Sequence, residues 1–383
     1  MGSNRPFVAR LPRMTGQCAL RLPGRLHKRA GVSLMASCVV WSCAALVLVS
    51  SALAQNGGHS PSASAPAANQ TPAVVLDGAS RNDTSTLKEM EDQIASRDFK
   101  GSIPALRQYV KKNPDSARAH YDLGYALFRT HQLGDSIRQL SKSLELNPRD
   151  AQAHKILGLD CSLVGRYDLA EVELQQAARF EPNSAEIHYL LGRIYYTREV
   201  YPLAGKEFEA AIRLNPAYTK AFANLGLVRE IQGKNGDAVK DYQTAIRLNR
   251  QQKSGWAWPY EYLSAYYNRQ QRYQEAIAFA RKAISTDPKL DLAYFQIARA
   301  NENLGRWKKC EAAARKAIAL NSRTPDYYYV LSHALRKQGK AEASEAALKT
   351  FEKLHQKQLT ESERWQKAQE HSLQTASSRS GQP

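Results

Sequence analysis

Apolar residues between positions 83 and 358 fall into stretches with helical spacing, two to a unit, and the units recur along the chain. The clearest marker is a Leu-Gly pair that returns every 34 residues, at Leu123-Gly124, Leu157-Gly158, Leu191-Gly192 and Leu225-Gly226. A proline recurs at the same interval, at Pro114, Pro148, Pro182 and Pro216. A fixed period of this length predicts an array of helix pairs that bury their apolar faces by stacking on one another.

Other positions of the unit keep the same period when Ala117 is taken as position 1. Position 4 holds an imidazole or an aromatic ring, in His120, His154, His188 and Phe222. Positions 20 and 27 hold small residues, in Ser136, Ala170, Ala204 and Ala238 and in Ser143, Ala177, Ala211 and Ala245. Small side chains let two helix axes approach closely, so these positions predict the contacts between the helices.

The phase slips by four residues after Arg250 and then resumes. Position 4 continues as Tyr260, Tyr294 and Tyr328, and position 20 as Ala276, Cys310 and Ser344. Position 15 is glycine in four units, at Gly165, Gly233, Gly305 and Gly339. Glycine adopts a left-handed conformation without steric cost, so position 15 is where the first helix of a unit is expected to end. The inserted residues 253–256 indicate either a hinge or a local binding feature.

This pattern resembles the tetratricopeptide repeat, in which an aromatic residue precedes Leu-Gly and a proline closes the unit. The resemblance implies an all-α fold, a superhelical solenoid of about eight helix-turn-helix repeats plus a C-terminal capping helix. The units are expected at 83–116, 117–150, 151–184, 185–218, 219–252, 257–290, 291–324 and 325–358. The first unit lacks Leu-Gly, and the last has Phe351 where a small residue is usual. The last three units replace the glycine of position 8 by Ser264, Ala298 and Ser332.

A polar helix is expected to follow the last unit. Thr360 to Glu363 has the spacing of a capping box, which predicts a capping helix over 359–374. The remaining tail, 375–383, has a composition typical of disorder.

The N-terminal segment reads as a targeting sequence. Residues 1–54 carry seven basic side chains and no acidic one, then an uncharged apolar run that ends in Ala52, Leu53 and Ala54. This order is typical of a signal peptide cleaved after Ala54, although the run is also long enough to remain as an uncleaved anchor. Export to an extracytoplasmic compartment, most simply a bacterial periplasm, is favoured over a mitochondrial transit peptide, which lacks such an apolar core. Residues 55–82, rich in Ser, Ala, Gly, Pro and Asn, are expected to be a disordered linker.

Charge and reactive side chains add little specific chemistry. The net charge is +18, of which +11 remains once the seven basic residues of the N-terminal segment are removed. Such a body attracts acidic surfaces without choosing among them. His120, His154 and His188 occupy one repeat position, which favours a packing role over a metal site, and Cys161 and Cys310 are expected in the core. We find no catalytic motif, and we predict no enzyme activity, no catalytic residues, no metal and no cofactor.

The resemblance also implies a binding surface, because in this family positions 2, 5, 9, 12 and 13 of the first helices line the concave face. Tyr and Arg are the residue types that dominate binding hot spots. The residues expected in this partner-binding groove are Arg118, Tyr121, Tyr125, Phe128, Arg129, Tyr189, Arg193, Tyr196, Trp258, Phe295, Arg299, Tyr329, His333, Arg336 and Lys337.

Together these features predict an exported scaffold that binds extended or helical acidic segments of other proteins, by analogy in the assembly of an envelope complex. One alternative is a nucleic-acid-binding basic helical array, although no specific nucleic acid is expected. Another is a membrane-anchored regulatory subunit, which requires that the N-terminal segment stays uncleaved.

Overall fold

The computed structural model describes the backbone of residues 81–379 and the side chains of residues 87–360. The predicted signal peptide at 1–54 and nearly all of the predicted linker at 55–82 lie outside these residues. The described part forms sixteen α-helices and no strand. The helices are α1 Arg81–Ala95, α2 Phe99–Lys112, α3 Ala117–Arg129, α4 Leu133–Leu146, α5 Ala151–Leu163, α6 Tyr167–Phe180, α7 Ala185–Thr197, α8 Tyr201–Leu214, α9 Thr219–Ile231, α10 Asn235–Gln251, α11 Trp258–Arg269, α12 Tyr273–Thr286, α13 Asp291–Asn303, α14 Trp307–Leu320, α15 Pro325–Lys337 and α16 Ala341–Arg379.

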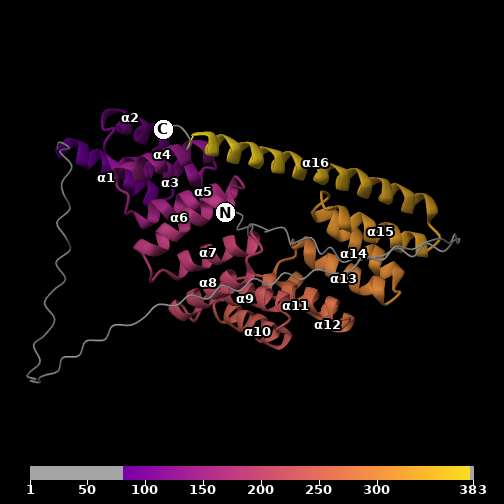
Figure 1. Ribbon diagram of the computed structural model, residues 1–383. Helices are drawn as coiled ribbons and strands as arrows, with labels where there is room; N and C mark the ends of the chain where they lie inside the picture. The colour runs from indigo at the N-terminus through magenta and orange to yellow at the C-terminus, as the bar shows by residue number, and fades with distance from the viewer. Residues whose placement is uncertain (1–80, 380–383) are drawn as a thin grey trace, which may run out of the picture. The chain divides into compact units, whose positions relative to one another are not determined.

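These helices follow one another as eight antiparallel pairs (Figure 1). The first, odd-numbered helix of each pair packs against the second, and the second packs against the first helix of the next pair. First helices of most successive pairs also contact one another, whereas the backbones of second helices pack mainly against first helices. Second helices meet through long side chains, as in Arg107 of α2 with Asp135 of α4 at 2.8 Å. The first helices therefore form an inner layer and the second helices an outer one, which confirms the predicted all-α solenoid.

The glycines of position 8 lie where the two helices of a pair come closest. A Cβ atom on Gly124 would lie 2.7 Å from Cγ of Leu140, and a Cβ on Gly226 would lie 2.6 Å from Cε1 of Tyr242. In both pairs the close neighbour is position 24 of the same unit. Two later units reverse the sizes, with a side chain at position 8 and alanine at position 24, in Ser264 with Ala280 and Ala298 with Ala314.

The turn inside each pair has one residue in the left-handed conformation, always at position 15. The predicted glycines Gly165, Gly233, Gly305 and Gly339 all have positive φ, which confirms their role in ending the first helix. The remaining pairs use side-chain-bearing residues at the same position, in Arg97 (φ 68°), His131 (φ 61°), Glu199 (φ 62°) and Gln271 (φ 59°). The geometry of the turn is therefore common to all the pairs, and glycine only makes it easier to adopt.

In five units the side chain at position 4 lies within hydrogen-bond distance of a carbonyl oxygen at the end of the preceding unit. In His154 the ring Nδ1 lies 2.7 Å from Glu173 Oε2 and Nε2 lies 3.1 Å from the Pro148 carbonyl oxygen. His120 and His188 make the corresponding contacts, and the Tyr294 and Tyr328 hydroxyls also donate to a carbonyl oxygen six residues earlier, at 3.3 and 3.2 Å. Position 4 thus serves packing between pairs, the role expected for the histidines.

The insertion lengthens a helix and adds a loop. Second helices that precede a position-32 proline have 14 residues, whereas α10, with Arg250 at that position, has 17. Lack of the proline permits this extension but does not impose it, since α14 has 14 residues with Ser322 there. In the loop that follows, Lys253 and Gly255 have positive φ, and Asn249 Oδ1 accepts the backbone N–H of Trp256 at 3.3 Å. The loop is thereby tied back to the end of α10.

The C-terminal helix is present, but its predicted start needs correction. α16 is one continuous helix of 39 residues, so residues 359–374 continue the second helix of the last pair and residues 375–379 are helical. The reason is that no proline or glycine interrupts this stretch, and Gln356 stands where proline closes other units. Thr360, the expected N-cap, instead donates its hydroxyl to the Gln356 carbonyl oxygen at 3.0 Å within the helix.

Candidate partner-binding surface

The predicted residues on α3 form a layered group of aromatic rings. Tyr121 and Tyr125, one helical turn apart, are both half-buried, and their rings are parallel within 3° with centroids 6.3 Å apart. Phe99, at the start of α2, meets the Tyr125 ring edge-on at 5.8 Å. Phe128 is also half-buried and packs against the hydrophobic cluster that extends from α4 through α9. The inner face of α3 therefore leaves aromatic surface partly open to solvent.

Arg129 completes this group at the C-terminal end of α3. Its guanidinium carbon lies 4.3 Å from the centroid of the Phe99 ring, within the range of a cation–π contact. Its Nη1 donates to the Tyr125 hydroxyl at 2.8 Å, while the side chain stays exposed. We call the following residues the α3 surface: Phe99, Arg118, Tyr121, Tyr125, Phe128 and Arg129.

Arg118, at the other end of the α3 surface, is balanced by two carboxylates. Its Nε donates to Glu91 on α1 at 2.9 Å and to Asp122 at 3.0 Å. The pKa of Asp122 is raised to about 7, mainly by burial; the nearby Glu91 charge contributes to the rise and Arg118 opposes it. Burial and the charges of Asp150 and Asp122 also raise the pKa of Tyr121 to about 12, so this phenol keeps its proton. Arg129 is therefore the member of the surface whose positive charge has no acidic partner within the described residues.

Two predicted groove residues on α7 belong to the core. Tyr189 and Tyr196 are each 8% exposed. The Tyr189 ring packs 4.9 Å from Tyr218, and the Tyr196 ring packs 5.7 Å from Tyr201. Arg193, between them on α7, is half-buried and lies 5.9 Å from the Tyr189 ring. Because bulky rings of neighbouring helices cover Tyr189 and Tyr196, we remove both from the candidate surface.

The predicted residues on α11 and α13 are only partly accessible. Trp258, at the start of α11, is half-buried with its ring 5.7 Å from Tyr262. Phe295 on α13 packs against the buried ring of Tyr327 at 4.8 Å. Arg299 on α13 is exposed. These residues lie on another part of the first-helix layer and do not join the α3 surface.

The first helix of the last pair, α15, presents an aromatic side chain to solvent. Tyr329 is 52% exposed, and its ring lies 5.4 Å from Phe351 on α16. Phe351 in turn stacks on His355 at 5.4 Å. Phe351, a large residue where the repeat pattern has a small one, thus packs against the exposed Tyr329 at the end of the array.

The remaining predicted residues of α15 surround Trp307 of α14. The His333 ring lies 5.5 Å from Trp307, and its Nδ1 lies 2.6 Å from Glu302 Oε1. The Lys337 ammonium lies 5.9 Å from the Trp307 ring. Arg336 and Lys337 are both exposed. This cluster is more polar than the α3 surface and offers fewer open rings.

Sequence reasoning missed the acidic residues of the first-helix layer. Glu91, Glu261 and Glu302 occupy positions 9, 5 and 12, which are groove positions, so a search of the same positions for acids would have found them. Asp122 at position 6 and Phe99 on a second helix lie outside those positions, and only the packing shows their contacts with the predicted residues.

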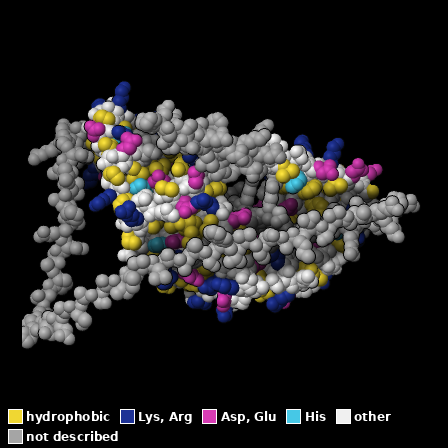
Figure 2. All heavy atoms as spheres, in the orientation of Figure 1, with side chains coloured by type: hydrophobic (Ala, Val, Ile, Leu, Met, Phe, Trp, Pro, Cys, Tyr) yellow, Lys and Arg dark blue, Asp and Glu magenta, His cyan; other side chains and the backbone are white. Residues whose placement is uncertain are grey.

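The charge of the array is dispersed rather than gathered. On the face drawn in Figure 2, Lys and Arg side chains alternate with Asp and Glu. Several cations of the first-helix layer are paired, as in Lys155 with Glu186 at 2.9 Å and Arg269 with Glu230 at 2.6 Å. The net positive charge alone therefore does not define the candidate surface.

The fold and this surface define a class: a helical repeat protein with a scaffold architecture. Family models described as tetratricopeptide repeat match residues 87–151, 164–219, 224–291 and 292–324. The chain therefore belongs to the tetratricopeptide-repeat family, whose domains generally bind proteins or peptides rather than catalyse reactions. No curated protein matches the chain.

Solved structures share the fold. The chain is similar to a protein in the structure described as the APC/C hetero-tetramer Cut9-Hcn1, with 16% identity and a TM-score of 0.54, over 66% of this chain and 46% of that one. It is also similar to MamA, with 25% identity and a TM-score of 0.41, over 43% of this chain and 96% of MamA. The third is YrrB, described as a protein with an unusual peptide-binding site, with 21% identity and a TM-score of 0.41 over 50% of this chain and 96% of YrrB.

Within the described residues, no helix is both long and apolar enough to cross a bilayer. The same part of the chain holds no group of three or more His, Cys, Asp or Glu side chains arranged to hold a metal ion. Cys161 and Cys310 are buried free thiols, as expected, and burial raises the pKa of each to about 12.

Proposed function

We propose that this protein is an exported scaffold that binds a segment of a partner protein on the α3 surface. The observation that carries the proposal is the set of half-buried, stacked rings of Tyr121 and Tyr125 with Arg129 over Phe99. Rigid aromatic rings beside a guanidinium are typical of binding hot spots, because they bury a large area with little loss of side-chain entropy.

The chemistry of the surface indicates the partner. Arg129 is held in place by Phe99 and by the Tyr125 hydroxyl, yet it makes no ion pair with any described residue. A preorganised guanidinium binds a carboxylate more strongly than a mobile one does, since less entropy is lost on binding. We therefore expect an extended or helical segment that places an acidic side chain against Arg129 and an apolar or aromatic one against Tyr121 and Tyr125.

Export rests on the sequence of the N-terminal segment. The basic residues, the apolar run and the small residues ending at Ala54 support a signal peptide, and the alternative of a retained anchor also places the array across the membrane. The proposed compartment is the periplasm, and assembly of an envelope complex is the setting that follows by analogy.

The proposal is tested by capture from envelope extract with the full-length protein and the variant Tyr125→Ala/Arg129→Glu. Arg118 is left unchanged, because its loss would leave the buried Asp122 without a counter-charge and confuse binding with stability. The matched control is Arg247→Glu, an exposed cation on the second helix α10. Proteins retained by the native chain and by the control, but lost by the α3 variant, are the expected result.

A partner identified in this way should bind the α3 variant at least about 30-fold more weakly, the loss expected when two hot-spot side chains are removed. Equal retention by the native chain and the α3 variant would show that this surface is not the binding site. Capture of the partner only from an extract of another compartment, and not from envelope extract, would argue against the proposed periplasmic setting.

A further inference from the structure

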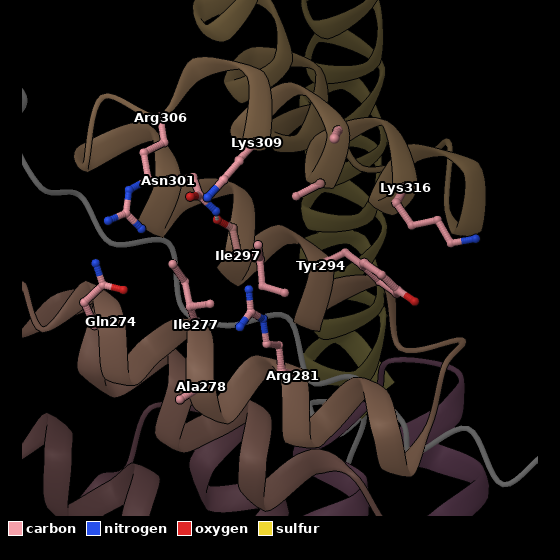
Figure 3. Close-up of a pocket in the computed structure, with 12 residues that line it drawn as sticks. Gln274, Ile277, Ala278, Arg281, Tyr294, Ile297, Asn301, Arg306, Lys309 and Lys316 are labelled. Atoms are coloured by element: carbon pink, nitrogen blue, oxygen red, sulfur yellow. Dashed lines mark hydrogen bonds between the residues drawn. The ribbon is translucent and has the colours of Figure 1, made fainter.

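The outer layer contains a cavity that the proposed function does not use. It has a volume of about 420 Å³ and lies between α12, α13 and α14. Its floor is apolar, from Ile277 and Ile297, and its walls are polar (Figure 3). A cavity of this size matches a small molecule or a headgroup rather than a folded partner.

The cavity walls are strongly basic. Four cations line the cavity, and no acidic side chain does: Arg281, Arg306, Lys309 and Lys316. Arg281, Arg306 and Lys309 extend toward a common space from α12 and from the start of α14 (Figure 3). Arg281, Lys309 and Lys316 make no ion pair with any described residue, whereas Arg306 can donate to the side-chain oxygen of Gln274 at 2.9 Å.

Comparison with the other repeats shows how the cavity arises. Position 23 of earlier units carries a polar side chain that reaches the position 4 ring: Gln139, Glu173 and Glu207. In this unit position 23 is Ala313, as alanine also is in the first and last units, and no side chain from this position fills the space. Position 19 holds Lys309, the only lysine at that position in the eight units. The site therefore combines a small residue at position 23 with a lysine at position 19 that no other unit has.

Asn301 supplies a second, independent feature. It is 3% exposed and lines the cavity from position 11, where comparable units hold Leu127, Cys161 and Leu335. Its Nδ2 donates to the Ile297 carbonyl oxygen at 2.8 Å, but its Oδ1 is buried without any hydrogen-bond partner among the described residues. A buried acceptor left unpaired is costly, so this oxygen is suited to a donor supplied by a ligand.

We propose that this cavity binds a phosphate monoester that carries a neighbouring hydroxyl group. A phosphate monoester has a charge of about −1.5 to −2 at neutral pH and three acceptor oxygens, which suits three convergent cations better than a single carboxylate does. The hydroxyl group donates to Asn301 Oδ1, and the carbon skeleton lies on Ile277 and Ile297. The ligand is either a free metabolite or the headgroup of a phosphate monoester lipid, which present the same chemistry.

The test is isothermal titration of the full-length protein with glycerol 3-phosphate, beside flotation with vesicles that contain lysophosphatidic acid, a lipid phosphate monoester that keeps a free hydroxyl group. The site variant is Arg281→Gln/Lys309→Gln. Its matched control is Arg247→Gln/Lys308→Gln, which removes the same charge from exposed residues that do not line the cavity. The variant Ala313→Glu places beside the cations a carboxylate such as Glu173 and Glu207 have at this position, and it should block the site. Because Ala313 is only 8% exposed, circular dichroism checks that this variant keeps its fold.

We expect the affinity for at least one probe to fall at least tenfold in the site variant and in Ala313→Glu. In the control the affinity should fall less than twofold. Binding of vesicles without binding of free glycerol 3-phosphate assigns the ligand to a lipid headgroup. Asn301→Leu should weaken the same probe at least threefold. Absence of binding to both probes, equal losses in site variant and control, or equal binding of succinate would overturn the proposal. All of these outcomes are independent of the α3 surface.

Discussion

Single side-chain volumes set how closely the two helices of a pair approach. In the six units between the terminal ones, position 8 is glycine where position 24 is large, as in Gly124 with Leu140, and it carries a side chain where position 24 is alanine, as in Ser264 with Ala280. The total volume at the crossing is kept while its distribution changes, which is the pattern expected of a close-packed core.

Gly124→Ala should therefore destabilise the protein by roughly 1 to 3 kcal/mol, because the new Cβ would lie 2.7 Å from Leu140 Cγ. The control is Gly134→Ala in the same unit, where a Cβ meets nothing within 4 Å and alanine favours the helix. Urea unfolding should show opposite signs for the two variants, and Gly124→Ala/Leu140→Ala should relieve the clash but leave the cost of the lost leucine. Equal effects of the two glycine substitutions would contradict the close approach.

Buried carboxyl groups form a second feature at the residue scale. Glu261 is 4% exposed and accepts the Gln296 Nε2–H at 2.8 Å. Burial raises its pKa to about 7, with Asp291 and Glu230 adding to the shift and Arg269 and Gln296 opposing it. The native protein therefore binds a proton here between about pH 4.5 and 7 that the unfolded chain releases, so this group makes the free energy of unfolding fall as pH rises across that window.

Glu261→Gln should remove this dependence, because an amide does not ionise. We expect the free energy of unfolding of the variant to equal that of the native protein near pH 4 and to exceed it by roughly 2 to 4 kcal/mol at pH 8. Unfolding curves at several pH values provide the measurement. Parallel pH profiles for the two proteins would show that Glu261 titrates normally.

At the scale of elements, the turn within each pair was predictable and the helix ends were less so. Position 15 is left-handed even where the residue is Glu199 or His131, because the helix pair requires that backbone angle. A following proline ends a second helix, and α10 and α16, with Arg250 and Gln356 in its place, run on. Proline is not required, because α14 ends at Leu320 with Ser322 at that position. A capping box inside a stretch without helix breakers is not enough to start a new helix.

The turn allows a paired prediction on stability. Glu199→Gly should stabilise the protein by about 1 kcal/mol, because a side chain in the left-handed region is strained and glycine is not. Gly165→Ala should destabilise it by a similar amount for the same reason. Thermal unfolding of both variants measures the effect, and a shift of the same sign in both would contradict this reading of position 15.

At the scale of the whole molecule, the period predicted the helix pairs but not which of their side chains remain open. Tyr121 and Tyr189 occupy the same repeat position, yet one is half-buried and the other is covered by Tyr218. Exposure depends on the neighbours that the adjacent pair supplies, and a repeat position alone does not contain that information. The basic cavity was not predicted from the sequence for a similar reason: its cations occupy different positions of two units, and only the packing shows that they line one space.

The most direct test of the central claim is site-specific photo-crosslinking of the full-length protein in living cells. A photoreactive residue is placed at Tyr125 on the α3 surface and, in a separate protein, at Arg247 on the outer layer. The account predicts a crosslink to an envelope protein from position 125 that is absent from position 247. A crosslink from position 247 alone, or the same products from both positions, would contradict partner binding on the α3 surface.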